Sequence, residues 1–256
     1  MSDFSLSIDS PHAGVRRVCW TRPGRLNAFT NELYQAILDA VVAAGQDPSV
    51  RVLWLTGGGG AFSAGNDLDE FERNPMASLD APVFRLLTAV STFRKPLVMT
   101  PSGVAIGIGT TLCLHADFVN CQGNVRFQMP FVPLGLCPEG GSSLLVPSLV
   151  GHARAMSWLL LGAPILADEA LQSGLVNAVH DTAEALEEQT LMLVRRLAEL
   201  PPEAVAASKR LIKGHGRDQL QSVLAREGQQ FIDQLPLPEA REALAAFREK
   251  RKPSFS

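Results

Sequence analysis

Short apolar stretches bounded by glycine, proline and polar residues recur along the first half of the chain. Their length and their β-branched residues predict strands, at residues 4–8, 15–21, 51–56, 97–100 and 117–121. Thr30 is suited to cap a helix, because apolar residues follow it at helical spacing from Leu33 onward. A second helix is expected over residues 81–92. Strands that alternate with helices predict a mixed α/β protein.

From about residue 147 the apolar residues recur mainly at helical spacing. This pattern predicts helices, over residues 153–161, 168–172, 183–200, 202–213, 219–234 and 238–250. Their amphipathic faces can cover a sheet or meet another subunit, and the sequence does not separate these roles. Since no fixed-period repeat or low-complexity linker interrupts the chain, we interpret the helical part as an appendage on one domain.

The composition suits one large domain with a well-filled core. Of the 256 residues, 46% are hydrophobic, and the net charge is −3. No global positive field therefore attracts nucleic acid or an anionic membrane, so we expect neither as a partner. Four widely separated cysteines indicate reduced thiols, and neither a targeting pattern nor an apolar run of about 18 residues is present. A cytoplasmic protein is expected.

Two glycine-rich segments carry the most informative local pattern. Four glycines, Gly57 to Gly60, follow the strand at 51–56, and residues 103–109 form a second glycine-hinged turn that opens a helix over 110–115. Neither segment has the lysine of a phosphate-binding loop, the glycine order of a dinucleotide fingerprint or the serine spacing of a nucleophile elbow. Two interpretations remain open: each turn donates a backbone N–H to one oxyanion, or each merely needs glycine for tight packing.

Several short blocks, in this order, resemble the enoyl-CoA hydratase/isomerase (crotonase) superfamily over nearly the whole chain: residues 22–28, 62–68, 95–96 with 103–109, 127–141 and 174–177. The resemblance implies a spiral of ββα repeats that forms two roughly perpendicular sheets. It places the spiral core at residues 1–195 and a C-terminal helical region for trimerisation at 196–256. The implied partners are an acyl-CoA substrate and identical subunits in a homotrimer or a dimer of trimers, without a metal or a separate cofactor.

The same resemblance implies the site residues. Backbone N–H groups of Asn66 and Ile108 would hold the thioester oxygen, and the turn with Arg22, Arg25 and Leu26 would lie along the CoA. In similar proteins the acid at Asp67 more often stabilises its loop. Thr111 and Phe131 stand where hydratase-like relatives carry their two glutamates, so simple hydration is doubtful. The remaining expected substrate contacts are Ala64, Gly65, Leu68 and Gly107.

Residues 129–143 resemble the Δ3,Δ2-enoyl-CoA isomerases, whose single catalytic glutamate corresponds to Glu139. One mobile carboxylate can move a proton from C2 to C4 of a 3-enoyl-CoA. Alternatively, Glu139 is only the N-terminal acid of a helix over 140–149. Other functions also stay open: hydration, ring-opening isomerisation, thioester hydrolysis, or non-catalytic binding of a CoA ester or RNA.

Overall fold

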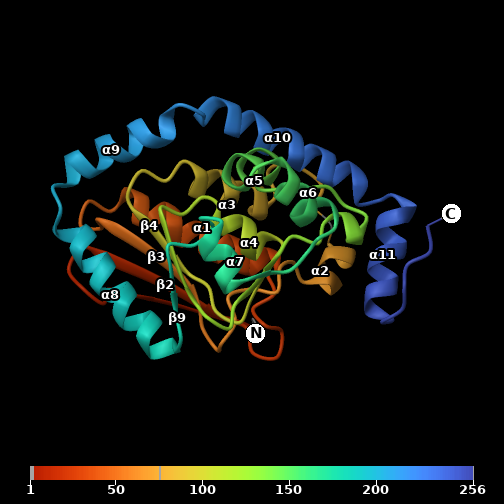
Figure 1. The fold of residues 1–256 in the computed structure, drawn as a ribbon, viewed down its shortest axis with the longest axis horizontal. Coiled ribbons are helices and arrows are strands. Elements are labelled where there is room, and N and C mark those ends of the chain that lie inside the picture. The colour runs from red at the N-terminus through yellow and green to blue at the C-terminus, as the bar shows by residue number, and fades with distance from the viewer. Residues whose placement is uncertain (1–2, 75, 256) are drawn as a thin grey trace.

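The computed structural model describes residues 3–74 and 76–255 of the chain. In this part, strands form a six-stranded and a three-stranded sheet, with helices around them (Figure 1). The larger sheet has the order β1-β2-β3-β4-β6-β9, with strands Ser5–Asp9, Val15–Thr21, Val52–Gly57, Leu97–Thr100, Phe118–Gln122 and Ala178–His180. The expected α/β architecture with two sheets is confirmed, and the five strands expected in the first half lie within one residue of their expected ends.

Strand β3 lies in the middle of the larger sheet and is apolar on both faces. It pairs in parallel with β2 and β4. Val52 and Trp54 pack in a cluster with Val194 and Ala198 of helix α8 (Ala183–Glu199), whereas Leu53 and Leu55 belong to the main core. A continuous apolar run is typical of a strand that is covered on both faces, since neighbouring side chains point in opposite directions.

The main core is closed on its other side by helices α1 (Asn31–Gln46) and α3 (Pro82–Ser91), which pack against each other. Thr30 caps α1, because its hydroxyl accepts a hydrogen bond from the N–H of Leu33 at 3.2 Å. The sequence had predicted both helices, and each buries one apolar face.

The smaller sheet corrects one prediction. It has the order β5-β7-β8, with strands Val104–Ile106, Arg126–Gln128 and Ile165–Leu166. The segment 103–109 is therefore more than a turn, because β5 occupies its centre and helix α4 (Ile108–Cys113) begins two residues earlier than expected. Strands of two or three residues are too short to leave a periodic pattern, so the sequence did not reveal them.

The helical last third is confirmed. Helices α9 and α10 pass across the top of the view in Figure 1, and α11 descends at the right. Their bounds, with those of the shorter helices, are α2 Leu68–Arg73, α5 Ser142–Val150, α6 His152–Leu160, α7 Ala167–Gln172, α9 Pro202–Gly214, α10 Arg217–Gln234 and α11 Pro238–Arg248, with a 3₁₀ turn at Val132–Leu134. Lys209 of α9 donates to Asp117 at 2.5 Å, which ties this helix to the start of β6.

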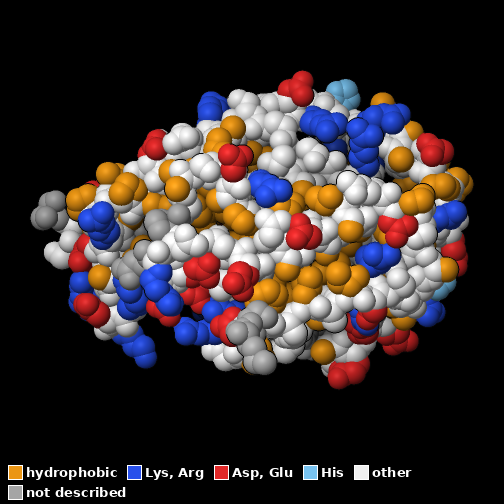
Figure 2. Space-filling model, turned by 180° about the vertical axis from the view of Figure 1, so that it is seen from behind, with side chains coloured by type: hydrophobic (Ala, Val, Ile, Leu, Met, Phe, Trp, Pro, Cys, Tyr) orange, Lys and Arg blue, Asp and Glu red, His pale blue; other side chains and the backbone are white. Residues whose placement is uncertain are grey.

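The opposite face shows apolar side chains interspersed with charged ones (Figure 2). The large apolar side chains with the greatest exposure include Leu161, Leu211 and Ile212, at 74%, 69% and 78%. Among residues 3–74 and 76–255, no helix combines the length and the apolar content that crossing a bilayer requires. The division of the chain at residue 195 stays a prediction.

Candidate active site

The first glycine turn is held in place by Asn27. Its side-chain amide donates to the carbonyl oxygens of Gly58 and Ala61, at 2.8 and 2.6 Å. Asn27 itself has a φ of 58°, a left-handed conformation that asparagine tolerates better than most residues. A Cβ at Gly57 would stand 2.3 Å from the oxygen of Ala61, so glycine is required there for packing. The packing interpretation of this turn is therefore correct as far as Gly57 is concerned.

The second turn is attached directly to the continuation of the first. Ser63 forms a parallel bridge with Ala105, and the N–H of Ile106 donates to the oxygen of Ser63 at 2.9 Å. Asn66 and Ile108 each lie three residues beyond this bridge. A Cβ at Gly65 would lie 3.0 Å from the oxygen of Ile106, so the two chains approach closely here.

The backbone N–H groups of Asn66 and Ile108 have no acceptor among the described residues. The bridge between Phe29 and Asn66 uses the oxygen of Gly65 and the N–H of Asp67, which leaves the N–H of Asn66 outside it. Ile108 is the first residue of α4, where an N–H has no acceptor within the helix. The fold thus leaves both expected donors available, on segments joined by one bridge.

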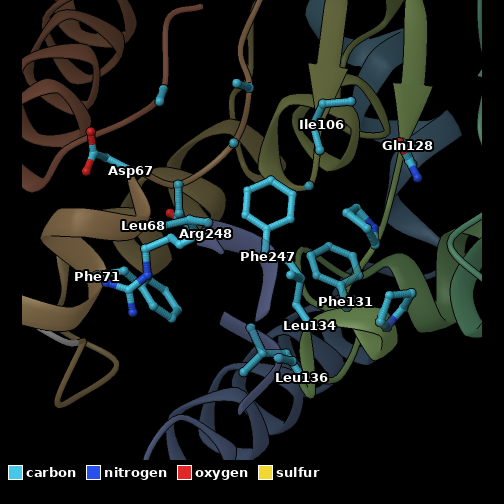
Figure 3. A pocket seen from close by; sticks show the side chains of 18 of the residues that line it. Asp67, Leu68, Phe71, Ile106, Gln128, Phe131, Leu134, Leu136, Phe247 and Arg248 are labelled. Atoms are coloured by element: carbon cyan, nitrogen blue, oxygen red, sulfur yellow. The ribbon is translucent and has the colours of Figure 1, made fainter. Parts of the chain in front are cut away.

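A cavity of about 710 Å³ lies beside these turns. Figure 3 shows apolar side chains pointing into it from α2, from the segment 131–136 and from α11. Nine of the expected site residues line it, namely Arg25, Leu26, Ala64, Gly65, Asn66, Asp67, Leu68, Gly107 and Phe131. The sequence had not indicated Gln128 or Phe247, which also line it, because their ordinary core or surface patterns distinguish neither of them.

Arginines contribute positive charge to the cavity wall. Arg25 and Arg126 come from the first half of the chain, and Arg248 and Arg251 come from α11 and the residues after it. Arg25 pairs with Asp69 at 3.2 Å, and Arg251 pairs with Glu242 and Glu249 at 2.5 Å. Asp67 and Asp69 also line the cavity, so acids offset part of this positive charge.

Arg22 corrects a sequence-based expectation. Its side chain does not line the cavity but is buried, with ion pairs to Asp67 at 2.5 Å and to Asp3 at 2.7 Å. Asp67 also caps α2 by accepting a hydrogen bond from the N–H of Glu70 at 2.9 Å. Burial opposes ionisation of Asp67, but these hydrogen bonds together lower its pKa. Arg22 thus stabilises the turn instead of contacting a ligand, and Asp67 does stabilise its loop.

Thr111 and Glu139 form a buried pair outside the set of residues that line the cavity. Oε1 of Glu139 accepts a hydrogen bond from the hydroxyl of Thr111 at 2.6 Å, whereas Oε2 has no partner among the described residues. Burial, with a smaller contribution from Glu227, raises the pKa of Glu139 to about 8, although the bond from Thr111 opposes this. Neither residue lines the cavity, and the expected substrate contact of Thr111 stays a prediction. Ile108 is likewise buried and does not line the cavity.

The hydrogen bonds also test the interpretation of Glu139 as a helix N-terminal acid. Helix α5 begins at Ser142, and the N–H groups of Gly141 and Ser143 donate to the carboxylate of Glu227, at 2.6 and 2.8 Å. Glu227, on α10, therefore occupies the position of the acid at this helix start. The side chain of Glu139 is left for another role.

Tyr34 is a site residue that the sequence did not reveal. Its hydroxyl donates to Oδ1 of Asn66 at 2.6 Å, and its side chain is 1% exposed. Burial, with the negative charge of Glu139 nearby, raises the pKa of Tyr34 well above its ordinary value. The helical pattern from Leu33 onward did not single out Tyr34, because helical spacing does not distinguish a core tyrosine from one that binds a neighbour.

The cysteines and metal ligands give no second site. All four cysteines are free, and burial raises the pKa of Cys137 to about 12, so its thiol stays protonated. In the part of the chain that the structure describes, no three histidine, cysteine or acidic side chains come together as a metal-binding group.

Comparison with known proteins identifies the family to which this two-sheet fold belongs. The family model for enoyl-CoA hydratase/isomerase matches residues 11–256, so the chain belongs to this family. It is 34% identical to a 2,3-dehydroadipyl-CoA hydratase of Escherichia coli, covering 91% of this chain and 92% of that protein. It is 32% identical to the human enoyl-CoA delta isomerase 2, covering 88% of this chain and 58% of that protein. The crystal structure of an enoyl-CoA hydratase/isomerase from Pseudoalteromonas atlantica covers all of this chain with a TM-score of 0.91 and 38% identity.

Proposed function

We propose that the protein is an acyl-CoA isomerase, which shifts the double bond of a 3-enoyl-CoA to the 2 position. One observation carries the proposal: Glu139 is a buried carboxylate with one oxygen held by Thr111 and the other without a partner among the described residues. A double-bond shift on one face of the substrate needs one proton carrier. Addition of water needs two groups, one that takes a proton from water and one that donates a proton to carbon.

The proposed reaction has two steps. The N–H groups of Asn66 and Ile108 bind the thioester oxygen, so that negative charge accumulates there when C2 loses a proton. The ionised carboxylate of Glu139 takes that proton, and the electron pair of the C2–H bond is delocalised over the dienolate. Glu139 then returns the proton to C4, while the double bond forms between C2 and C3. Its raised pKa, about 8, lies close to neutral pH, so the group can both accept and donate a proton there.

The cavity suits the two ends of such a substrate. Phe71, Phe131 and Leu136 provide apolar surface for an acyl group. Arg25 and Arg126 provide positive charge for the phosphates of CoA. For binding to be productive, Glu139 must become accessible to the acyl group, because it is 5% exposed and does not line the cavity.

Substitution of Glu139 by glutamine tests the proposal. The wild-type protein should convert a 3-enoyl-CoA to the conjugated 2-enoyl thioester, followed by its absorbance. Glu139→Gln should lower kcat by about 10²- to 10⁴-fold, because glutamine cannot carry the proton. Glu188→Gln, at an exposed position on α8, serves as the matched control and should keep full activity. A Glu139→Gln protein with near-normal isomerisation would refute the proposal.

Hydration is the second candidate, favoured by the 34% identity to a protein named as a hydratase. Thr111 and Phe131 weigh against it, because neither side chain can act as an acid or a base. Incubation of the protein with a 2-enoyl-CoA in water distinguishes hydration from isomerisation. Loss of its conjugated absorbance at a rate that exceeds isomerisation would favour hydration.

We also propose that the protein forms a homotrimer or a dimer of trimers. Support comes from the family and from exposed apolar side chains on α9, Leu211 and Ile212. Leaving such side chains in water is unfavourable, so contact with another subunit would stabilise them.

A further inference from the structure

Glu227 lies on α10, far along the chain from Glu139. Both oxygens of its carboxylate nevertheless accept hydrogen bonds from residues that closely follow Glu139. Oε2 accepts the N–H of Gly141 at 2.6 Å, and Oε1 accepts the N–H of Ser143 at 2.8 Å. Its side chain is buried, at 8% exposure. Hydrogen bonds from N–H groups to an ionised carboxylate are stronger than those between neutral groups. A buried pair of them makes a firm attachment between α10 and the start of α5.

The residues so attached form the loop that carries Glu139. Gly140 and Gly141 have φ of 70° and 75°, so the loop turns sharply through two left-handed residues. The backbone carbonyl oxygen of Glu139 accepts two hydrogen bonds from Ser142, one from its N–H at 3.2 Å and one from its hydroxyl at 2.6 Å. Leu220 of α10 also lies over Gly141, where an added Cβ would come within 2.6 Å of its Cδ1. The position of Glu139 therefore depends on a helix of the last third of the chain.

Helix α4 holds the opposite side of the same loop. Nε2 of His115 lies 2.8 Å from the oxygen of Gly140. Burial lowers the pKa of His115 to about 4, so its ring is neutral at neutral pH, and Nε2 must carry the hydrogen that this carbonyl accepts. Thr111, on the same helix, donates to Oε1 of Glu139. Since His115 is neutral, α4 adds no charge to the loop.

The charged and titratable groups around Glu139 can be named element by element. Tyr34 of α1 and Cys137 of its own segment are protonated at neutral pH, because burial raises both pKa values. Thr111 and His115 of α4 are neutral. Glu227 of α10 is the negative group that acts on Glu139. A like charge close to a carboxylate favours its protonated form.

We infer that Glu227 is a positioning residue, which clamps the loop carrying Glu139 to α10 through the N–H groups of Gly141 and Ser143. The inference rests on the proposed role of Glu139 as the proton carrier. The clamp keeps the free oxygen of Glu139 at a fixed place, and the negative charge that makes the clamp also favours protonation of Glu139. The side chain of Glu227 thus both holds the loop in place and favours the protonated form of Glu139.

Glu227→Gln tests the inference, because glutamine keeps the size but has one acceptor oxygen and no charge. Glutamate labelled with carbon-13 at the carboxyl reports the titration of Glu139 by NMR, and Glu139→Gln identifies its signal. In Glu227→Gln the midpoint of Glu139 should move to lower pH. Of the amide hydrogens of Gly141 and Ser143, the one that loses its acceptor should exchange with solvent about tenfold faster. Activity toward a 3-enoyl-CoA should fall about tenfold in kcat, with KM nearly unchanged.

Two further variants separate the clamp from other effects. Glu227→Asp keeps the charge on a shorter side chain, so kcat should fall while the midpoint of Glu139 stays above that of Glu227→Gln. Asp218→Asn changes an exposed acid in the first turn of α10 and should alter none of the readouts. An unmoved midpoint together with unchanged exchange in Glu227→Gln overturns the inference. Since both readouts are independent of turnover, they hold even if the enzyme catalyses another reaction.

Discussion

Arg22 and Arg25 are three residues apart in the sequence, but their surroundings give them different roles. Arg22 is 6% exposed and bound to two carboxylates, whereas Arg25 is exposed and lines the cavity. Removing one partner of a buried ion pair is costly, because the other charge is left without compensation. The position of a side chain relative to the core therefore decides its role here.

Glu139 shows the same effect for an acid, and its burial makes stability depend on pH. Its pKa is raised from 4.5 to about 8, so the folded state favours the protonated form. The contribution of this group to stability is complete below about 4.5 and is lost as the pH rises through about 8. Each pH unit between the two pKa values corresponds to about 1.4 kcal/mol.

Glu139→Gln should therefore increase the melting temperature relative to wild type, and the increase should be larger at pH 8.5 than at pH 5. The reason is that glutamine is never charged and avoids the cost of burying a carboxylate. Thermal unfolding of both proteins at the two pH values measures this. We expect the gain in the free energy of unfolding to be larger at pH 8.5 than at pH 5 by a few kcal/mol. Glu188→Gln, being exposed, should show no such dependence. A difference that shrinks as the pH rises would contradict this prediction.

At the scale of elements, the contact between the two glycine segments is decisive. Gly103 leads into β5 and has a φ of 61°. A Cβ there would lie 2.1 Å from the oxygen of Gly60, so β5 and the first turn can approach only if residue 103 is glycine. Gly59 has a similar φ of 71°, but a Cβ there would meet nothing within 4 Å. The two glycines have similar φ and differ in packing.

Gly103→Ala should therefore destabilise the protein more than Gly59→Ala. We expect about 1 kcal/mol for Gly59→Ala, from the left-handed conformation alone. Gly103→Ala should cost at least about 1–3 kcal/mol more, because the backbone must move to relieve the overlap. Urea unfolding of both variants gives the two free energies. Equal losses would show that the contact with Gly60 can relax without cost.

At the scale of the whole molecule, the cavity combines segments from both ends of the chain. Arg25 and Leu26 line it from the first part of the chain, and Arg251 and Phe247, which Figure 3 labels, line it from the last residues. Helix α10 likewise reaches the loop of Glu139. The C-terminal helices thus contribute to the site itself, in addition to any contact with another subunit.

The proposed trimer gives a prediction at this scale. Ile212 of α9 is 78% exposed, so Ile212→Glu should leave the stability of the single subunit nearly unchanged. In an apolar contact between subunits, however, the new charge would be buried and would favour dissociation. Sedimentation should show trimers or hexamers for wild type and smaller species for Ile212→Glu. Ser148→Glu, at an exposed position on α5, is the control. An unchanged assembly would place Ile212 outside the contact.

The sequence by itself determined the helices and the longer strands, because their apolar periodicity reflects which face of each element is buried. It also indicated the turns with Asn66 and Ile108 and the single acid Glu139, through the order of short motifs. Only the tertiary structure revealed that Arg22 pairs with Asp67, that Tyr34 binds Asn66 and that Glu227 holds the loop of Glu139. These partners are separated by 45, 32 and 86 residues along the chain. A periodic pattern describes the environment of one element, whereas such contacts depend on how distant elements pack together.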